Sequence, residues 1–113
     1  SSLRFVASTG SPCAPDVKRS MIEWFGPIIN ETYASSEAGM ITSINSAEAL
    51  QRPGSAGRPV LDARVRILNE AGDPLPTGEI GLIYVRQPVY PDFTYRHNDA
   101  ARRAIERDGL ISL

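Results

Sequence analysis

Two short apolar segments separated by a helical pattern constrain the fold of this chain more than any other feature. Residues 3–7 and 28–32 have the composition of buried strands, and residues 15–25 between them repeat apolar side chains at helical spacing. A strand, a helix and a strand in that order form a parallel pair, and parallel strands normally need helices on both faces and further neighbours. Two such strands do not make a finished sheet, which argues against the single complete domain that a chain of 113 residues would ordinarily form.

The helix expected over residues 15–25 begins at a proline, which is tolerated in the first helical turn, and it ends at Gly26-Pro27. Its apolar side chains recur at i, i+4, i+7 and i+8, at Val17, Met21, Trp24 and Phe25. We expect this face to pack against the parallel strands. Lys18 is the one lysine of the sequence, and its position within the helix predicts a solvated surface residue.

Beyond residue 62 the pattern changes to the two-residue period of a strand. Ala63, Val65 and Ile67 alternate with arginines, and turn-forming residues then dominate the stretch 69–78. Alternation resumes with three further apolar side chains: Ile80, Leu82 and Tyr84. This pattern predicts an antiparallel hairpin with a long loop.

A last helix is expected over residues 99–107, with Asn98 or Asp99 as its N-cap and Gly109 at its end. Its inward face is predicted to carry Ala101, Ala104 and Ile105.

These patterns together predict an α/β fold in three parts. A parallel strand–helix–strand layer occupies about residues 1–50, an antiparallel β portion about residues 57–87, and a short helix the C-terminal end. We expect the antiparallel portion to form a small sheet of its own.

The charge balance narrows the classes of partner. With 12 basic and 13 acidic residues the net charge is −1, so no basic surface favours nucleic acid. One cysteine, Cys13, and one histidine, His97, exclude an internal disulfide and a His/Cys zinc site within the chain, and they fit a reduced cytoplasmic setting. No run reaches the ~18 apolar residues of a membrane span, and the sequence shows neither a signal peptide nor an initiator Met.

Residues 30–39 place nucleotide-binding chemistry in a short stretch. Tyr33 offers a flat face for a base, the small residues Ala34 and Ser35 let a ligand approach the backbone, and Ser36 can donate to a phosphate. Glu37 can hold a hard divalent cation through oxygen. A strand that runs into a polar turn, with an N-capping serine before Glu37, would give a similar sequence, so the stretch alone leaves both interpretations open.

The same stretch resembles the Tyr-Gly-x-Thr-Glu signature of the adenylate-forming superfamily, and three other segments match in order. Residues 3–16 resemble the apolar strand followed by Ser-Gly-Gly-Ala-Pro-Leu and a helix. Residues 53–59 resemble the Pro-Gly-Ser-x-Gly-Lys-Pro turn, and residues 78–86 resemble the Gly-Glu-x-Gly-Glu-Leu-x-Val-Arg strand.

The resemblance implies a role for individual residues. Tyr33 would stack on adenine, Ser36 would hydrogen-bond the α-phosphate, and Glu37 would ligate Mg²⁺, which makes the last two the expected catalytic residues. Ala34 replaces the usual glycine at the base of the acyl pocket. The full set of implied nucleotide-binding positions is Gly10, Ser11, Pro12, Glu31, Thr32, Tyr33, Ala34, Ser35 and Ser36.

The resemblance further implies that the chain is an internal fragment of the large N-terminal domain of an acyl-CoA synthetase or acid:CoA ligase. The parent would use a small carboxylic acid, ATP, Mg²⁺ and coenzyme A as an AMP-forming ligase in the cytoplasm. Residues 1–50 would form the nucleotide-site part and residues 51–90 a β-barrel-like part, while residues 91–113 would lead to a ribose-binding motif that the sequence does not reach.

The fragment itself is expected to be inactive. Residues 8–12 resemble a phosphate-binding loop without its lysine, and the ribose-binding aspartate, the hinge and the C-terminal catalytic lysine are missing. A slice also exposes surface meant for burial, so self-association is expected.

Two other functions remain open from the sequence. The parent could be an adenylation domain that loads a carrier protein, or the chain could be a non-catalytic α/β interaction module. Retention of Tyr33, Ser36 and Glu37 speaks against the module, because a scaffold has no need of them.

Overall fold

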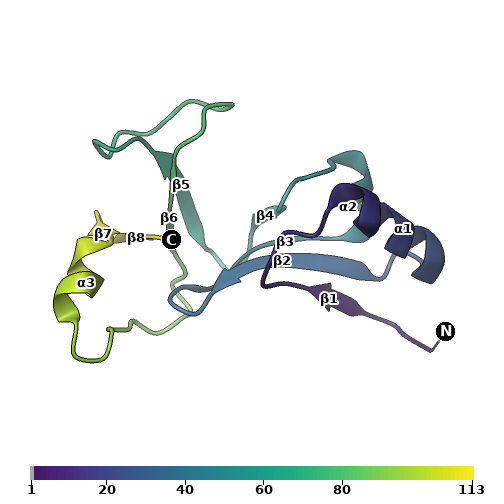
Figure 1. The fold of residues 1–113 in the computed structure, drawn as a ribbon, viewed down its shortest axis with the longest axis horizontal. Helices are drawn as coiled ribbons and strands as arrows, with labels where there is room; N and C mark the ends of the chain where they lie inside the picture. The colour runs from purple at the N-terminus through teal and green to yellow at the C-terminus, as the bar shows by residue number, and fades with distance from the viewer. Residues whose placement is uncertain (1) are drawn as a thin grey trace.

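Residues 2–113 are described by a computed structural model that has two four-stranded sheets meeting near its middle (Figure 1). Ser1, the first residue of the predicted 1–50 layer, lies outside the described residues. The principal extents are 49 × 32 × 21 Å, and the radius of gyration of 16.1 Å exceeds the ~13 Å of a compact domain of this length. The chain is therefore elongated, with the α1 and α2 helices at one end and α3 at the other.

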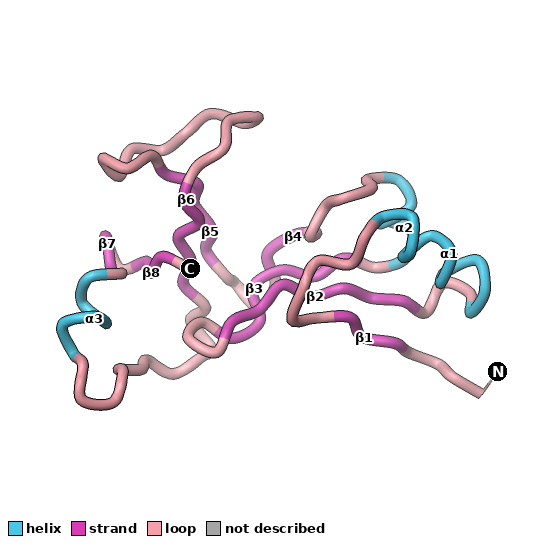
Figure 2. Tube along the Cα trace, viewed as in Figure 1, coloured by secondary structure: helices cyan, strands magenta, loops and turns pink. Residues whose placement is uncertain are grey.

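The first sheet has the order β1-β2-β3-β4 and carries two helices on one side (Figures 1 and 2). Its elements are β1 (Val6–Ser8), α1 (Pro15–Phe25), β2 (Ile29–Ser35), β3 (Gly39–Ile44), α2 (Ser46–Gln51) and β4 (Arg58–Pro59). The predicted parallel pair is confirmed, with Val6 beside Ile29 and Ser8 beside Glu31. The hairpin of β2 and β3 and the short α2 extend this layer beyond the elements assigned from the sequence.

The helix α1 has the predicted bounds, but it buries a different face. Ile22 and Lys18 are buried beneath it, whereas Val17 is half exposed and Trp24 is 83% exposed. The predicted packing of the Val17, Met21, Trp24 and Phe25 face against the strands is therefore wrong for this chain. The period of apolar residues locates a helix, but a lysine whose stem is buried and whose charge is paired can occupy the inner face instead.

The second sheet is antiparallel throughout, with the order β5-β6-β8-β7. Its strands are β5 (Arg64–Leu68), β6 (Leu82–Arg86), β7 (Glu106–Arg107) and β8 (Leu110–Ser112). The predicted hairpin is confirmed as the β5–β6 pair, in which Arg64 faces Arg86. Ile80 precedes β6 and is 99% exposed, so the prediction that Ile80 belongs to the strand is wrong.

The boundary between the sheets also differs from the sequence pattern. The short β4, within the stretch 57–87, pairs with β3 of the first sheet. In the other direction, β7 and β8 bring residues 106–112 into the second sheet.

The last helix is α3 (Asp99–Ala104), shorter than predicted because β7 begins at Glu106. The Asn98 side chain caps it by accepting a hydrogen bond from the Ala101 amide at 3.1 Å. Ile105 packs against the apolar core as predicted and Ala101 is half-buried, but Ala104 is exposed and Arg102 is buried in its place, so the predicted inward face is correct only in part.

Arg102 is buried because its charge is matched. Its guanidinium donates to Asp92 Oδ1 and to Glu106 Oε2, each at 2.8 Å, and lies over the Phe93 ring. The hydrogen bond from Arg102 holds the pKa of Asp92 below its usual range.

None of the helices in the described part of the chain has the length and the apolar composition that crossing a membrane requires.

One apolar core joins the two sheets. Its buried members are Ala38 and Ile41 from the first sheet and its turn, Ala63 from the connection, and Val85 and Ile111 from the second sheet. The Gln87 side chain crosses the same joint, donating to the Met40 carbonyl at 2.7 Å and to the Val60 carbonyl at 3.0 Å. The two sheets are therefore parts of one packed unit.

Gly57 tests how closely the chain packs at β4. An added Cβ would lie 1.9 Å from the Ser43 carbonyl oxygen, and the backbone has a φ of +88°. Gly54, three residues earlier, has a similar φ of +83° with nothing within 4 Å of the added atom. We expect Gly54→Ala to cost ~1–2 kcal/mol through its backbone conformation and Gly57→Ala to cost at least about 3 kcal/mol. Urea unfolding of the two variants measures the difference, and equal losses would show that β4 does not pack this closely.

Candidate nucleotide site

A pocket of about 290 Å³ lies at the edge of the first sheet where β1 and β2 end. Three segments line it: the loop after β1, the C-terminal half of β2, and the loop after α2. The lining residues are Gly10, Ser11, Pro12, Glu31, Thr32, Tyr33, Ala34, Gly54 and Ala56. The volume is at the lower end of the range for small-molecule sites.

The parallel crossover explains why these segments meet. Because β1 and β2 run in the same direction, their carboxyl ends lie side by side, with Ser8 next to Glu31. The loop that leaves β1 towards α1 therefore passes beside β2, which is where open α/β sheets bind ligands. Gly10 takes a φ of +91° in this loop, a conformation that glycine adopts without strain.

Tyr33 connects the pocket to the core. Its side chain packs against the core that joins the sheets, and it also lines the pocket. The pairing of β2 with β3 shifts register between Tyr33 and Ala34, a bulge that places the ring at a bend of the strand. Burial raises the pKa of the Tyr33 phenol, so it stays neutral at physiological pH. A neutral aromatic ring supported from behind by packed side chains can serve as a stacking surface.

Glu31 reaches the pocket wall as half of a buried ion pair. Lys18 Nζ lies 2.7 Å from Glu31 Oε2, and both side chains are largely hidden from solvent. The expectation of a solvated Lys18 is therefore wrong. The helix α1 directs this side chain inward over β2, where a carboxylate balances its charge.

Ser36 and Glu37 lie in the turn between β2 and β3 and do not line the pocket. Ser35 Oγ accepts a hydrogen bond from the Ala38 amide at 3.0 Å, which closes this turn. The structural alternative is therefore present in part: β2 runs into a polar turn, and Ser35 before Glu37 caps an amide of that turn, although no helix follows. The turn is a separate group of candidate residues beside the pocket-lining set.

Tyr95 contacts Glu37 across a separation of 58 residues. Its hydroxyl donates to Glu37 Oε1 at 3.3 Å. Burial and the negative charge of Glu37 raise the pKa of the Tyr95 phenol, so it remains a donor at neutral pH. The Phe93 ring meets the Tyr95 ring edge-on at 5.3 Å and supports it.

Three residues join the candidate site that were not assigned to it from the sequence. Gly54 and Ala56 line the pocket and belong to the glycine-containing segment 53–59, whose likeness to the superfamily turn was a usable signal. Tyr95 carries no such signal, because only folding brings it to Glu37.

The oxygen-bearing side chains near the pocket fit one mode of magnesium binding, in which the protein supplies a single carboxylate. Among residues 2–113, no three His, Cys, Asp or Glu side chains gather as a cage for a metal ion. Glu37 supplies a single carboxylate with a hydroxyl-bearing neighbour, Ser36. Mg²⁺ commonly binds through one or two carboxylates together with phosphates and water, and a lone carboxylate fits that mode.

Comparison with known proteins connects these residues to a family. A family model described as AMP-binding enzyme matches residues 1–90. The medium/long-chain-fatty-acid–CoA ligase FadD8 of Mycobacterium tuberculosis is 38% identical over 98% of this chain and 20% of its own length. The oxalate–CoA ligase of Arabidopsis thaliana is 34% identical over 90% of this chain and 20% of its own length.

Solved structures agree in fold. The o-succinylbenzoate CoA synthetase of Bacillus subtilis, in complex with the acyl-adenylate intermediate OSB-AMP, superposes with a TM-score of 0.86 at 22% identity, over 97% of this chain and 22% of that one. The chain spans about one fifth of the length of the curated relatives it matches. Because the family model covers residues 1–90 and the fold agrees, the chain belongs to the AMP-binding enzymes of the adenylate-forming superfamily.

Proposed function

We propose that this chain forms the adenosine side of the nucleotide site in an AMP-forming acid:CoA ligase. The observation that carries the proposal is that seven of the nine nucleotide-binding positions implied by the sequence line one pocket. They come from two segments, 10–12 and 31–34, that only the parallel crossover brings together. Ligase relatives that match most of the chain support the same assignment.

The pocket residues suit an adenine ring. Tyr33 supplies a stacking surface held by the core, and small residues from two loops also line the pocket. Gly10 and Gly54 carry no side chain, so a flat ring can approach the backbone there. The pocket binds and orients the nucleotide, which is the contribution that positioning makes to rate.

The turn beyond the pocket suits the phosphates. In the proposed reaction the substrate carboxylate attacks the α-phosphorus of ATP, pyrophosphate leaves, and coenzyme A then displaces AMP from the acyl-adenylate. Ser36 would donate to the α-phosphate, and Glu37, oriented by Tyr95, would hold Mg²⁺. The ion would neutralise charge on the phosphates when bound.

The substrate class is inferred from the relatives. One relative is named for medium- and long-chain fatty acids, so we propose that the parent acts in fatty acid metabolism. The cytoplasmic location that we propose for it rests on the sequence, through its single cysteine. Ala34 stands where the superfamily signature has glycine, and its methyl would shorten the acyl pocket. Acid-dependent exchange of pyrophosphate into ATP by the full-length protein, followed by thioester formation with coenzyme A, tests the proposal. Absence of exchange with every fatty acid chain length would contradict it.

Glu37→Gln in the full-length protein should lower the exchange rate more than it weakens binding of the acid. The amide keeps the shape but loses the charge that acts where the transition state builds up charge. We expect a loss of about ten- to a hundredfold in exchange rate. Tyr95→Phe, which removes only the hydroxyl that reaches Glu37, should cost about two- to tenfold. A normal exchange rate with a lowered melting temperature in Glu37→Gln would remove the metal-ligand assignment.

The isolated 113-residue chain should be inactive and bind ATP no more tightly than about millimolar. It offers the pocket without the lysine-containing phosphate loop and the ribose carboxylate of the superfamily, and each lost charge-assisted contact removes roughly 1.5–3 kcal/mol. Titration calorimetry measures the affinity. Micromolar binding by the isolated chain would mean that the pocket and turn suffice.

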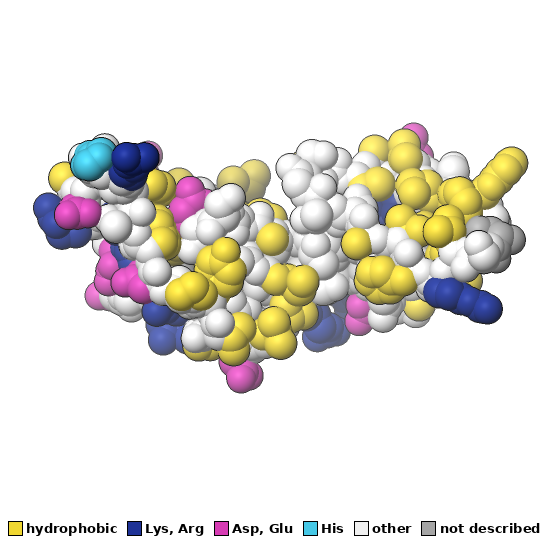
Figure 3. Space-filling view, turned by 90° about the horizontal axis from the view of Figure 1, so that it is seen from below, with side chains coloured by type: hydrophobic (Ala, Val, Ile, Leu, Met, Phe, Trp, Pro, Cys, Tyr) yellow, Lys and Arg dark blue, Asp and Glu magenta, His cyan; other side chains and the backbone are white. Residues whose placement is uncertain are grey.

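The isolated chain should also self-associate. Trp24 and Phe5 are exposed, and hydrophobic side chains gather at the end of the molecule that carries the N-terminus (Figure 3). Trp24→Glu should shift the chain towards monomer in sedimentation, because a charge on an apolar contact must be desolvated to re-form it. Glu23→Gln, which changes the charge at the position before Trp24 in the same helix, is the matched control. A wild-type chain that stays monomeric at high concentration contradicts this expectation.

A further inference from the structure

Lys18 is buried at 5% exposure although it is a charged residue on a short helix. Its ammonium lies 2.7 Å from Glu31 Oε2, the one carboxylate that pairs with it in residues 2–113. Glu31 Oε2 is itself buried without an aligned hydrogen bond, so the contact with Lys18 is what balances its charge. Neither charge can lose the other without leaving an uncompensated ion in the interior.

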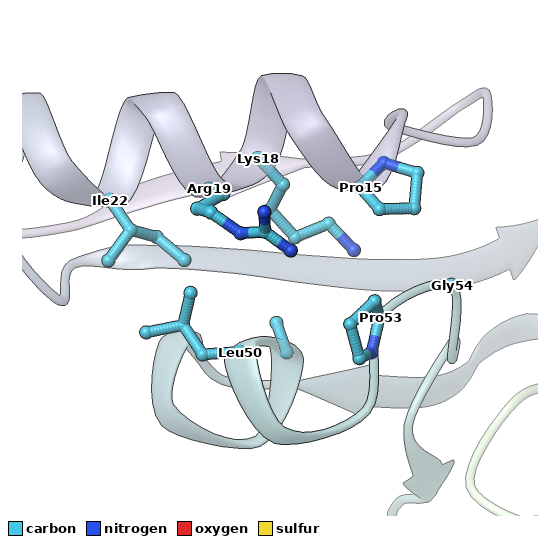
Figure 4. Close-up of a pocket in the computed structure, with 8 residues that line it drawn as sticks. Pro15, Lys18, Arg19, Ile22, Leu50, Pro53 and Gly54 are labelled. Carbon is cyan, nitrogen blue, oxygen red and sulfur yellow. The ribbon is translucent and has the colours of Figure 1, made fainter.

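The pair lies in the wall between two cavities. Lys18 lines a small one between α1 and α2, together with Pro53 and Gly54 (Figure 4). Its volume of about 10 Å³ holds at most about one water molecule, so no ligand meets Lys18 there. Glu31 and Gly54 line the nucleotide pocket on the other side. Lys18 therefore acts on that pocket only through Glu31 and the loop after α2.

The position of the Lys18–Glu31 pair in the chain allows it to influence the width of the pocket. Lys18 is in the first turn of α1, where its amide donates to the Ala14 carbonyl at 2.9 Å. Residues 10–12, in the preceding loop, line the pocket, and Glu31 begins the segment of β2 that also lines it. An ion pair between α1 and β2 thus joins the element that follows the lining loop to the lining strand.

An apolar contact could hold the same two elements together but would fix their relative position less sharply. A short pair of opposite charges has one favoured separation, whereas apolar side chains of suitable volume repack with small shifts. Figure 4 shows the Lys18 side chain extending from α1 towards Pro53, along the space between the two helices.

We propose that Lys18 is a positioning residue of the nucleotide site. Through Glu31 it fixes the distance between β2 and the loop that precedes α1, and so sets the affinity for the adenosine part of ATP. The proposal rests on the proposed function, since it assigns the ligand of the same pocket. It adds a residue that touches neither the nucleotide nor the acid.

The test compares three variants of the full-length protein. Lys18→Met keeps the aliphatic stem and removes the charge, and Arg19→Met removes a charge from the next position, which is exposed but lines the same small cavity. The double variant Lys18→Met, Glu31→Leu replaces the pair by apolar groups, so its melting temperature should recover to near that of the wild type.

We expect Lys18→Met to weaken ATP binding about ten- to a hundredfold, as other positioning losses do, with the rate at saturating ATP nearly unchanged. Arg19→Met should bind ATP normally. The double variant should regain its melting temperature but not its ATP affinity. Calorimetric titration with ATP, below the melting temperature of each variant, measures affinity independently of turnover.

Two results would overturn the proposal. If Lys18→Met melts earlier but binds ATP normally, the pair serves stability alone. If the double variant regains both stability and affinity, any packed contact suffices and the charge has no positioning role. Failure of the proposed function is distinguishable from both, because the wild-type protein itself would then not bind ATP.

Discussion

The packed joint between the two sheets is the constraint on which the rest of this structure depends. Ile41 and Val85, one from each sheet, have no exposed surface and belong to the same core. The Gln87 amide adds two hydrogen bonds to carbonyls of segments on the other side. A buried amide is stable only when its donors are satisfied, so these bonds fix an orientation that apolar packing alone would leave loose.

That joint also assembles the candidate site. Tyr33 lines the pocket and also packs on the shared core. The turn that carries Glu37 contacts Tyr95, which lies in the loop after β6. Arg102 holds this loop through Asp92 and the Phe93 carbonyl. The end of the molecule that carries α1 and α2 contributes a different contact, because the Lys18–Glu31 ion pair joins α1 to β2 and Glu31 lines the pocket. The pocket and the turn that carries Glu37 are thus held by separate contacts.

Local patterns predicted the helix bounds of α1, the parallel pair and the β5–β6 hairpin, because period and turn chemistry are properties of neighbouring residues. They failed on which faces are buried. In α1 and α3 the buried positions include Lys18 and Arg102, each of which meets a carboxylate from another element. A hydrophobic period cannot register a charge that is neutralised at a distance in sequence. The hairpin of β2 and β3 was not predicted from the sequence, because the bulge between Tyr33 and Ala34 interrupts its two-residue period.

The sequence by itself determined the family and seven of the nine residues that line the pocket, because those seven positions sit in contiguous motifs whose chemistry can be read directly. Only the tertiary structure decided how those motifs are held. The partner of Glu31, the donor to Glu37 and the support behind Tyr33 come from residues remote in the chain. Such contacts exist only once the backbone has closed its loops, and pairing of buried charges then selects among the faces that local propensity leaves equivalent.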